Sequence, residues 1–184
     1  MTNILENINS LILEVLSGGI PNIKIITKTG REEKIKTMLI ELYNQYPSIP
    51  KFYNNIEIKF GVTPNSFNNK ITLNTRLKEP LGLLEVLVHE QLHGFVDKWV
   101  NKDADNEYKW LFPDYSDNGE RSFYLHIIVC WNTRNWLLNN LTSKEVDFIY
   151  SSWQAYPKTE ELVKKDFNKI KKILEQHDLV YKII

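Results

Sequence analysis

Five residues near the middle of the chain, His89-Glu90-Gln91-Leu92-His93, constrain its fold more than any other feature. The sequence around them is mostly apolar, from Pro80 to Val88 and from Gly94 to Trp99, which predicts one long, half-buried helix. Side chains four residues apart project from one face of a helix, so the two imidazoles can bind a single metal ion. Glu90 would then lie beside a metal-bound water and could take its proton. The motif therefore predicts a helix that carries two zinc ligands and a general base.

The composition allows a full hydrophobic core and argues against several classes of partner. Of the 184 residues, 42% are hydrophobic, and 23 basic residues balance 23 acidic ones. This neutral charge gives no general attraction to nucleic acid or to an anionic membrane surface. Cys130 is the single cysteine, which excludes an intramolecular disulfide and a cysteine-rich zinc site. We expect one domain that spans residues 1–184.

Hydrophobic periodicity predicts several helices and a few short strands. Besides the motif helix, helical spacing marks the segments 4–16, 31–46, 119–138, 143–156 and 159–176, and strand-like runs mark 23–27, 56–62 and 70–75. Turn-forming residues at 63–69 predict that the last two strands form a hairpin leading into the motif helix. Thr142 and Glu145 fit a capping box for the helix that follows them. The predicted fold class is α+β, with a small, mainly antiparallel sheet packed on the motif helix and its partner helices.

The chain is not expected to enter or cross a membrane. The first predicted helix carries Glu6 and Glu14 within its apolar pattern and has no basic leader, so it is typical of an amphipathic helix, not a signal peptide. No apolar run approaches the length that a membrane span requires. The expected location is the cytoplasm.

The order of these elements, together with the motif, resembles the zincin superfamily of zinc metallopeptidases. The resemblance covers residues 56–138 and implies a small sheet before the motif helix and a third zinc ligand from further along the chain. It also implies that the strand before the helix, here 70–75, forms an edge along which an extended peptide pairs. The metzincin branch is excluded, because it would require glycine and histidine where this chain has Val96 and Trp99.

Two residues compete for the role of third ligand, His126 and Glu120. Their six-residue spacing turns them about 120° apart on a helix, so both are not expected to face one metal. At a predicted helix start, Glu120 could instead favour the N-terminal end of the helix dipole. His126 lies in an apolar run, where an imidazole without a partner would be costly, and two other histidines need a ligand. We predict a Zn²⁺ site of His89, His93 and His126, with Glu120 as the alternative.

For other polar residues, the sequence gives less support for a role at this site. Glu85, four residues before His89, could accept a hydrogen bond from an imidazole, although a packing or surface role suits it as well. Tyr115, Tyr124 and Arg121 could each donate to a developing oxyanion, and no spacing rule distinguishes them. The fourth histidine, His177, lies in a charged helix and is predicted to be on the surface.

The function implied by the resemblance is hydrolysis of peptide bonds in a peptide or protein substrate. Glu90 would take the proton of the attacking water and pass it to the leaving amine. A zinc hydrolase of another amide or ester remains open as an alternative. So does a non-catalytic zincin-like binding module, whose structural zinc would need a fourth ligand, for example from an acidic residue within 101–120. A regulatory domain that binds peptides at its edge strand is a third alternative. Substrate specificity and oligomeric state have no signal in the sequence.

Overall fold

The computed structural model describes residues 19–27, 29–77, 79–97, 108–117, 119–152 and 155–182. The helix predicted at 4–16 lies outside the described residues. In chain order the elements are β1 (Asn22–Ile25), α2 (Arg31–Gln45), β2 (Asn55–Lys59), β3 (Asn65–Phe67), β4 (Lys70–Asn74), α3 (Pro80–Asp97), α5 (Phe123–Asn140), α6 (Ser143–Ser152), α7 (Pro157–Lys165) and α8 (Phe167–Gln176). The predicted α+β class is confirmed, because a small sheet is followed by a set of packed helices.

The sheet is mainly parallel, so the prediction of a mainly antiparallel sheet is wrong. Its strands lie in the order β1-β2-β4-β3. β1 pairs with β2 and β2 pairs with β4 in parallel, and only β3 runs antiparallel to β4. The β2–β4 register sets Ile56 opposite Ile71 and Ile58 opposite Leu73, and all four side chains are fully buried. Parallel pairing thus aligns the two buried stripes on one face of the sheet.

A hairpin does lead into the motif helix, but it joins β3 to β4 instead of β2 to β4. Its two-residue turn, Asn68-Asn69, has positive φ at both positions, 51° and 60°. This is the backbone of a type I′ turn, which asparagine tolerates better than most residues. Because β3 lies outside β4, the strand at this edge of the sheet is β3, and the prediction that 70–75 forms the edge is wrong.

Two helical predictions also need correction. The buried helix predicted from residue 119 begins at Phe123, because Gly119 and Ser122 both have positive φ and form a turn before it. The predicted helix 159–176 is two helices, α7 and α8, which meet at Asp166. By contrast, the predicted capping box of α6 is confirmed: the Thr142 hydroxyl donates to Glu145 Oε2 at 2.7 Å, and the Glu145 amide donates to Thr142 Oγ1 at 3.4 Å.

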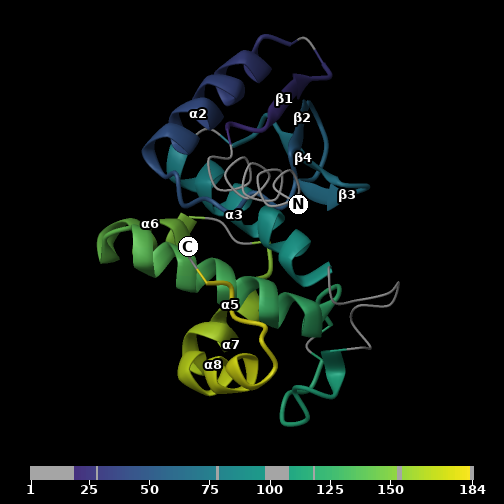
Figure 1. The fold of residues 1–184 in the computed structure, drawn as a ribbon, viewed down its shortest axis with the longest axis vertical. Coiled ribbons are helices and arrows are strands. Elements are labelled where there is room, and N and C mark those ends of the chain that lie inside the picture. The colour runs from purple at the N-terminus through teal and green to yellow at the C-terminus, as the bar shows by residue number, and fades with distance from the viewer. Residues whose placement is uncertain are drawn as a thin grey trace, which may run out of the picture.

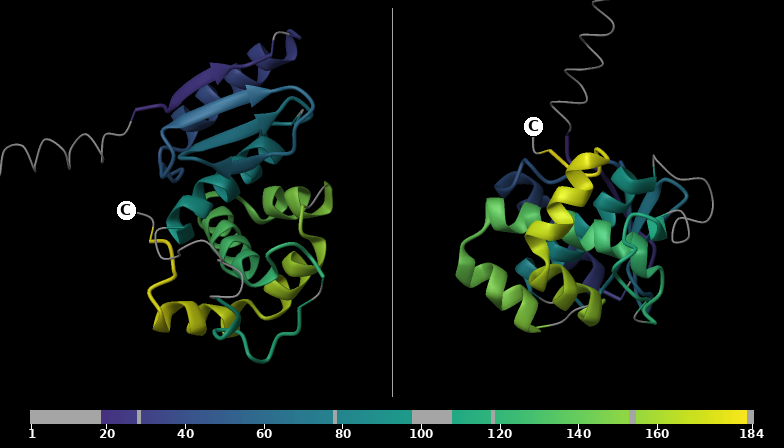
Figure 2. Two further views of the ribbon diagram at one scale, coloured as in Figure 1. Left: turned by 90° about the vertical axis from the view of Figure 1, so that its right-hand side faces the viewer. Right: turned by 90° about the horizontal axis from the view of Figure 1, so that it is seen from below.

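The motif helix α3 lies between two parts of the structure. The sheet and α2 lie on one side of it, and α5 to α8 lie on the other (Figure 1). Figure 2 shows the same division from the side, with α2 behind the sheet and the C-terminal helices below α3. The packing partners of α3 include α2, β3, β4, α5 and α6. None of the described helices contains a stretch long and apolar enough to span a membrane.

Candidate metal centre

Three histidines converge at the interface between α3 and α5. His89 and His93 lie one turn apart on α3, and His126 projects from the first turn of α5. One ligand nitrogen from each lies within 4.8 Å of those from the other two. The ring centroid of His126 lies 5.6 Å from that of His89 and 5.1 Å from that of His93. The packing of α3 against α5 thus brings together all three residues of the predicted ligand set.

A hydrogen bond orients the imidazole of His126. Its Nδ1 lies 2.9 Å from the carbonyl oxygen of Ser122. A carbonyl can only accept, so Nδ1 carries the proton and Nε2 is the nitrogen with the lone pair. His126 is buried, and so is its Nε2 atom. Metal-binding histidines usually make such a bond with their other ring nitrogen, because it holds the tautomer and the ring in place.

Burial keeps the imidazoles on α3 in the neutral form. It lowers the pKa of His93 to about 3, with a further contribution from His126. Burial and the neighbouring His93 and His126 hold the pKa of His89 well below its ordinary range. A protonated imidazole cannot bind a metal, so these two side chains are ready to act as ligands at neutral pH without releasing a proton.

Glu120, the alternative third ligand, belongs to a different part of the structure. Its carboxylate accepts hydrogen bonds from the backbone amides of Lys158 and Thr159, both at 3.0 Å, and from the Thr159 hydroxyl at 2.6 Å. These donors lie in the first turn of α7, where backbone amides have no partner within the helix. The sequence suggested an interaction of Glu120 with its own helix dipole, whereas the structure places it at the N-terminus of α7.

The first variable position of the motif anchors α3 to the segment before β2. Gln91 is fully buried, and its Oε1 accepts a hydrogen bond from the Tyr53 amide at 2.8 Å. Its Nε2 donates to the Tyr53 carbonyl at 3.0 Å and to the Tyr43 hydroxyl at 3.2 Å. A buried amide that is bonded on both sides fixes the rotation of the helix, and so the direction in which His89 and His93 point.

Gly94, directly after the motif, allows this close approach. A Cβ atom there would lie 2.5 Å from Cβ of Phe52 and 3.0 Å from the Tyr53 ring. We expect Gly94→Ala to lower the free energy of unfolding by about 1–3 kcal/mol, as overpacking of a core does. Gly82→Ala is the matched control in the same helix, because a Cβ atom at that position would meet nothing within 4 Å. Urea denaturation of both variants tests this, and equal stability of the two would contradict the predicted clash.

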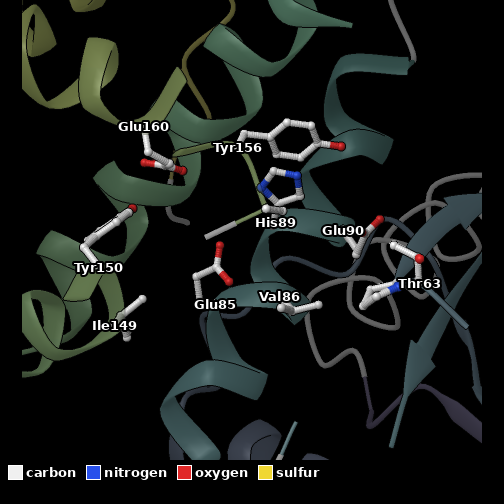
Figure 3. A pocket seen from close by; sticks show the side chains of 11 residues that line it. Thr63, Glu85, Val86, His89, Glu90, Ile149, Tyr150, Tyr156 and Glu160 are labelled. Carbon is white, nitrogen blue, oxygen red and sulfur yellow. The ribbon is translucent and has the colours of Figure 1, made fainter. Parts of the chain in front are cut away.

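A cavity of about 60 Å³ lies beside His89 and Glu90. Figure 3 shows side chains from α3, α6 and the start of α7, with Thr63 from the β2–β3 connection on the far side. Glu90 is only 7% exposed and lies on the wall that faces Thr63. The lining residues are Thr63, Pro64, Glu85, Val86, His89, Glu90, Ile149, Tyr150, Ala155, Tyr156 and Glu160. The general base predicted from the motif therefore borders a space that a reacting group can enter.

Tyr156 is a component of the centre that sequence reasoning missed. Its ring stacks on His126 with 3.7 Å between the ring centroids, and on His89 at 5.7 Å. Burial, followed by the charge of Glu90, raises the pKa of its hydroxyl to about 12, so the hydroxyl stays protonated and can donate. The residue lies in the α6–α7 connection, just before Pro157, and only the packing of α7 brings it to the histidines.

The residues that the sequence offered as oxyanion donors lie elsewhere. The Tyr115 hydroxyl donates to Asp166 Oδ2 at 2.9 Å, and the Tyr124 hydroxyl donates to the Tyr115 carbonyl at 3.3 Å. Arg121 is exposed and does not line the cavity. Glu85 does line it, but makes no hydrogen bond to a described histidine. His177 is on the surface at the end of α8, as predicted.

The described part of the chain thus brings three imidazole nitrogens together, and one of these imidazoles, His89, lines a cavity with the buried carboxylate of Glu90 and the stacked ring of Tyr156. Within that part, no carboxylate or thiolate joins the three histidines as a fourth potential ligand. Comparison of the chain with protein-family models, with curated proteins and with solved structures finds no match.

Proposed function

We propose that this protein is a zinc-dependent hydrolase that cleaves peptide bonds. The observation that carries the proposal is the convergence of His89, His93 and His126, with ligand atoms within 4.8 Å of one another, next to a cavity lined by Glu90. Three protein ligands with a fourth position for water are the arrangement of catalytic zinc, whereas structural zinc is closed by four. The resemblance of the motif and its preceding sheet to the zincins agrees with this proposal.

The donor set suits Zn²⁺. Neutral imidazoles are among the preferred ligands of zinc, and the described residues offer no thiolate at this position that would favour another type of site. Zinc held by the three histidines would act as a Lewis acid, lowering the pKa of water toward neutrality and polarising a carbonyl. The Nδ1–H bond from His126 to Ser122 presents Nε2 as the ligand atom of that residue.

The residues around the cavity supply the remaining chemistry. Glu90 takes the proton of the attacking water and later delivers it to the leaving amine. The Tyr156 hydroxyl, which is protonated at neutral pH, donates a hydrogen bond to the oxygen on which negative charge develops. The cavity wall then holds an acid–base group and a hydrogen-bond donor, which complement the Lewis acidity that zinc would supply.

The edge strand favours a peptide over a small amide or ester. β3 is the last strand in the sheet order, so its outer edge offers backbone groups to an added strand. Thr63 and Pro64 line the cavity and lead directly into β3. An extended peptide that pairs with β3 would therefore pass the cavity beside Glu90. A cytoplasmic location remains part of the proposal.

The first test is metal content. After dialysis, elemental analysis should find one zinc per chain, and His89→Ala and His93→Ala should each lose it, because each removes one of three ligands. His177→Ala is the matched control, since this histidine is exposed and distant in the sequence from the motif. If both motif variants retain full zinc after treatment with a chelator, the metal is bound elsewhere.

The second part of the same test is activity. The zinc-loaded protein should cleave members of a mixed peptide library, as detected by mass spectrometry, and a chelator should abolish cleavage until zinc is restored. Cleavage of amide or ester model compounds without cleavage of any peptide would support the alternative hydrolase. A zinc-loaded protein that cleaves neither would support a binding module.

A further inference from the structure

Two carboxyl groups face the cavity but have no part in the proposed hydrolysis. Glu85 projects from α3, and Glu160 projects from the first turn of α7. In Figure 3 both carboxyl groups point toward the middle of the cavity, and the hydroxyl of Tyr150 lies between them. They therefore form an acidic end of the cavity, next to His89.

These carboxyl groups form no close ion pair with a described residue, although the charge of Arg134 acts on Glu160. Glu160 is only 5% exposed, and its Oε2 accepts no hydrogen bond from any described residue. Neither Glu85 nor Glu160 forms an ion pair with a described lysine or arginine. Arg134 is a nearby cation, but its guanidinium stacks on the Tyr150 ring, 4.3 Å from the centroid. A buried carboxylate oxygen without a hydrogen-bond donor is costly, and a donor group on a bound ligand would remove that cost.

The electrostatics of the cavity also favour a cation. Burial, together with the charges of Glu160 and Glu90, raises the pKa of Glu85 to about 8. Burial raises the pKa of Glu160 to about 7, against the opposing effects of Cys130 and Arg134. A positive charge between two such groups would stabilise their ionised forms. At neutral pH much of Glu85 would hold its proton in the absence of a ligand, and a bound cation would favour release of that proton.

We infer that Glu85 and Glu160 form a subsite for a cationic group of the substrate, an ammonium or a guanidinium, next to the bond that is cleaved. That the bound cation belongs to a substrate rests on the proposed hydrolysis. The binding of a cation by these two residues does not depend on it. A cavity of about 60 Å³ has room for several waters, and therefore for the tip of a lysine side chain or for an α-ammonium group. Tyr150, which lines the same cavity, places its hydroxyl between the two carboxyl groups (Figure 3).

A second metal ion fits this position less well. Metal sites in proteins need at least three protein ligands or several bound waters, and the described residues supply two carboxylates here. The one group of three metal-binding side chains found among the described residues is that of the histidines. An organic cation needs only charge and hydrogen-bond acceptors, which both carboxylates provide.

The test measures binding without turnover. Three peptides are titrated calorimetrically into zinc-loaded protein that carries Glu90→Gln: Ac-Ala-Lys-Ala-NH₂, its norleucine analogue, and Ala-Ala-Ala-NH₂ with a free amino group. The lysine peptide should bind on the order of 30-fold more tightly than the norleucine peptide, as expected for a buried charge pair. If the free amino group shows the gain instead, the subsite is still cationic and takes the N-terminus of the substrate.

Variants of the two acids complete the test. Glu160→Gln and Glu85→Gln, each nearly isosteric, should remove most of the preference, whereas Glu161→Gln, on the exposed face of α7, should keep it. Circular dichroism confirms folding, and Glu160→Gln decides the outcome if Glu85→Gln does not fold. Equal binding of charged and neutral peptides overturns the inference, and so does a second zinc that Glu160→Gln removes. A lysine preference in a protein that cleaves no peptide would refute the proposed peptidase activity and keep the subsite.

Discussion

Glu90→Gln should lower the rate of peptide cleavage about 10²–10⁴-fold while the protein keeps its fold and its zinc. The amide has nearly the shape of the carboxylate, so the packing around this buried position should survive. An amide cannot take the proton of the attacking water at neutral pH, so only the chemistry should fail. Cleavage and zinc content are measured on the same preparations, which separates a lost base from a lost metal.

The matched control for this variant is Glu161→Gln, which removes one carboxylate at an exposed position of α7. It should retain the wild-type rate. Equal cleavage by wild type and Glu90→Gln would eliminate Glu90 as the base. Loss of zinc in Glu90→Gln would mean that the carboxylate supports the metal site directly, and the rate could then not be assigned to proton transfer.

His126→Ala should lower zinc affinity by more than the ~10–100-fold that loss of an outer hydrogen-bond partner costs a metal site. The reason is that it removes one of three ligand atoms and leaves His89 and His93 alone. Competition with a chelating dye measures the affinity. Unfolding in urea, followed in the absence of metal, shows whether the variant also loses stability.

Glu120→Ala is the comparison that separates the two candidate ligands. It should keep zinc but lower the free energy of unfolding by about 0.5–2 kcal/mol, because its carboxylate caps the first turn of α7. The reverse ranking, in which Glu120→Ala loses zinc and His126→Ala keeps it, would contradict the arrangement of the described structure.

Local patterns in the sequence were sufficient for the helices that depend on one amphipathic or apolar face. Apolar spacing predicted α2, and the uninterrupted apolar run predicted the buried character of α5. The capping box of Thr142 and Glu145 was also predicted, because all its partners lie within one turn. The break between α7 and α8 at Asp166 was missed, since apolar spacing continues across it.

These patterns could not predict whether neighbouring strands run parallel or antiparallel. An apolar–polar alternation shows which side chains of a strand are buried, but is the same for parallel and antiparallel neighbours. The segment 63–69 has the composition of a turn, and the sequence therefore predicted a hairpin between its neighbours. Within that segment β3 turns back along β4, and this added strand makes β2 and β4 parallel.

For the site, the sequence by itself determined that His89 and His93 share a helical face with Glu90 beside them, because an α-helix fixes side chains four residues apart. The sequence also limited the candidates for a third metal ligand to two residues, His126 and Glu120. Only the tertiary structure decided that α5 brings His126 to that face while Glu120 caps α7. It also decided that Tyr156 and Glu160 border the cavity. These residues come from separate elements of the fold. They lie close together only because the helices pack against one another, and the spacing of residues along the sequence does not predict that packing.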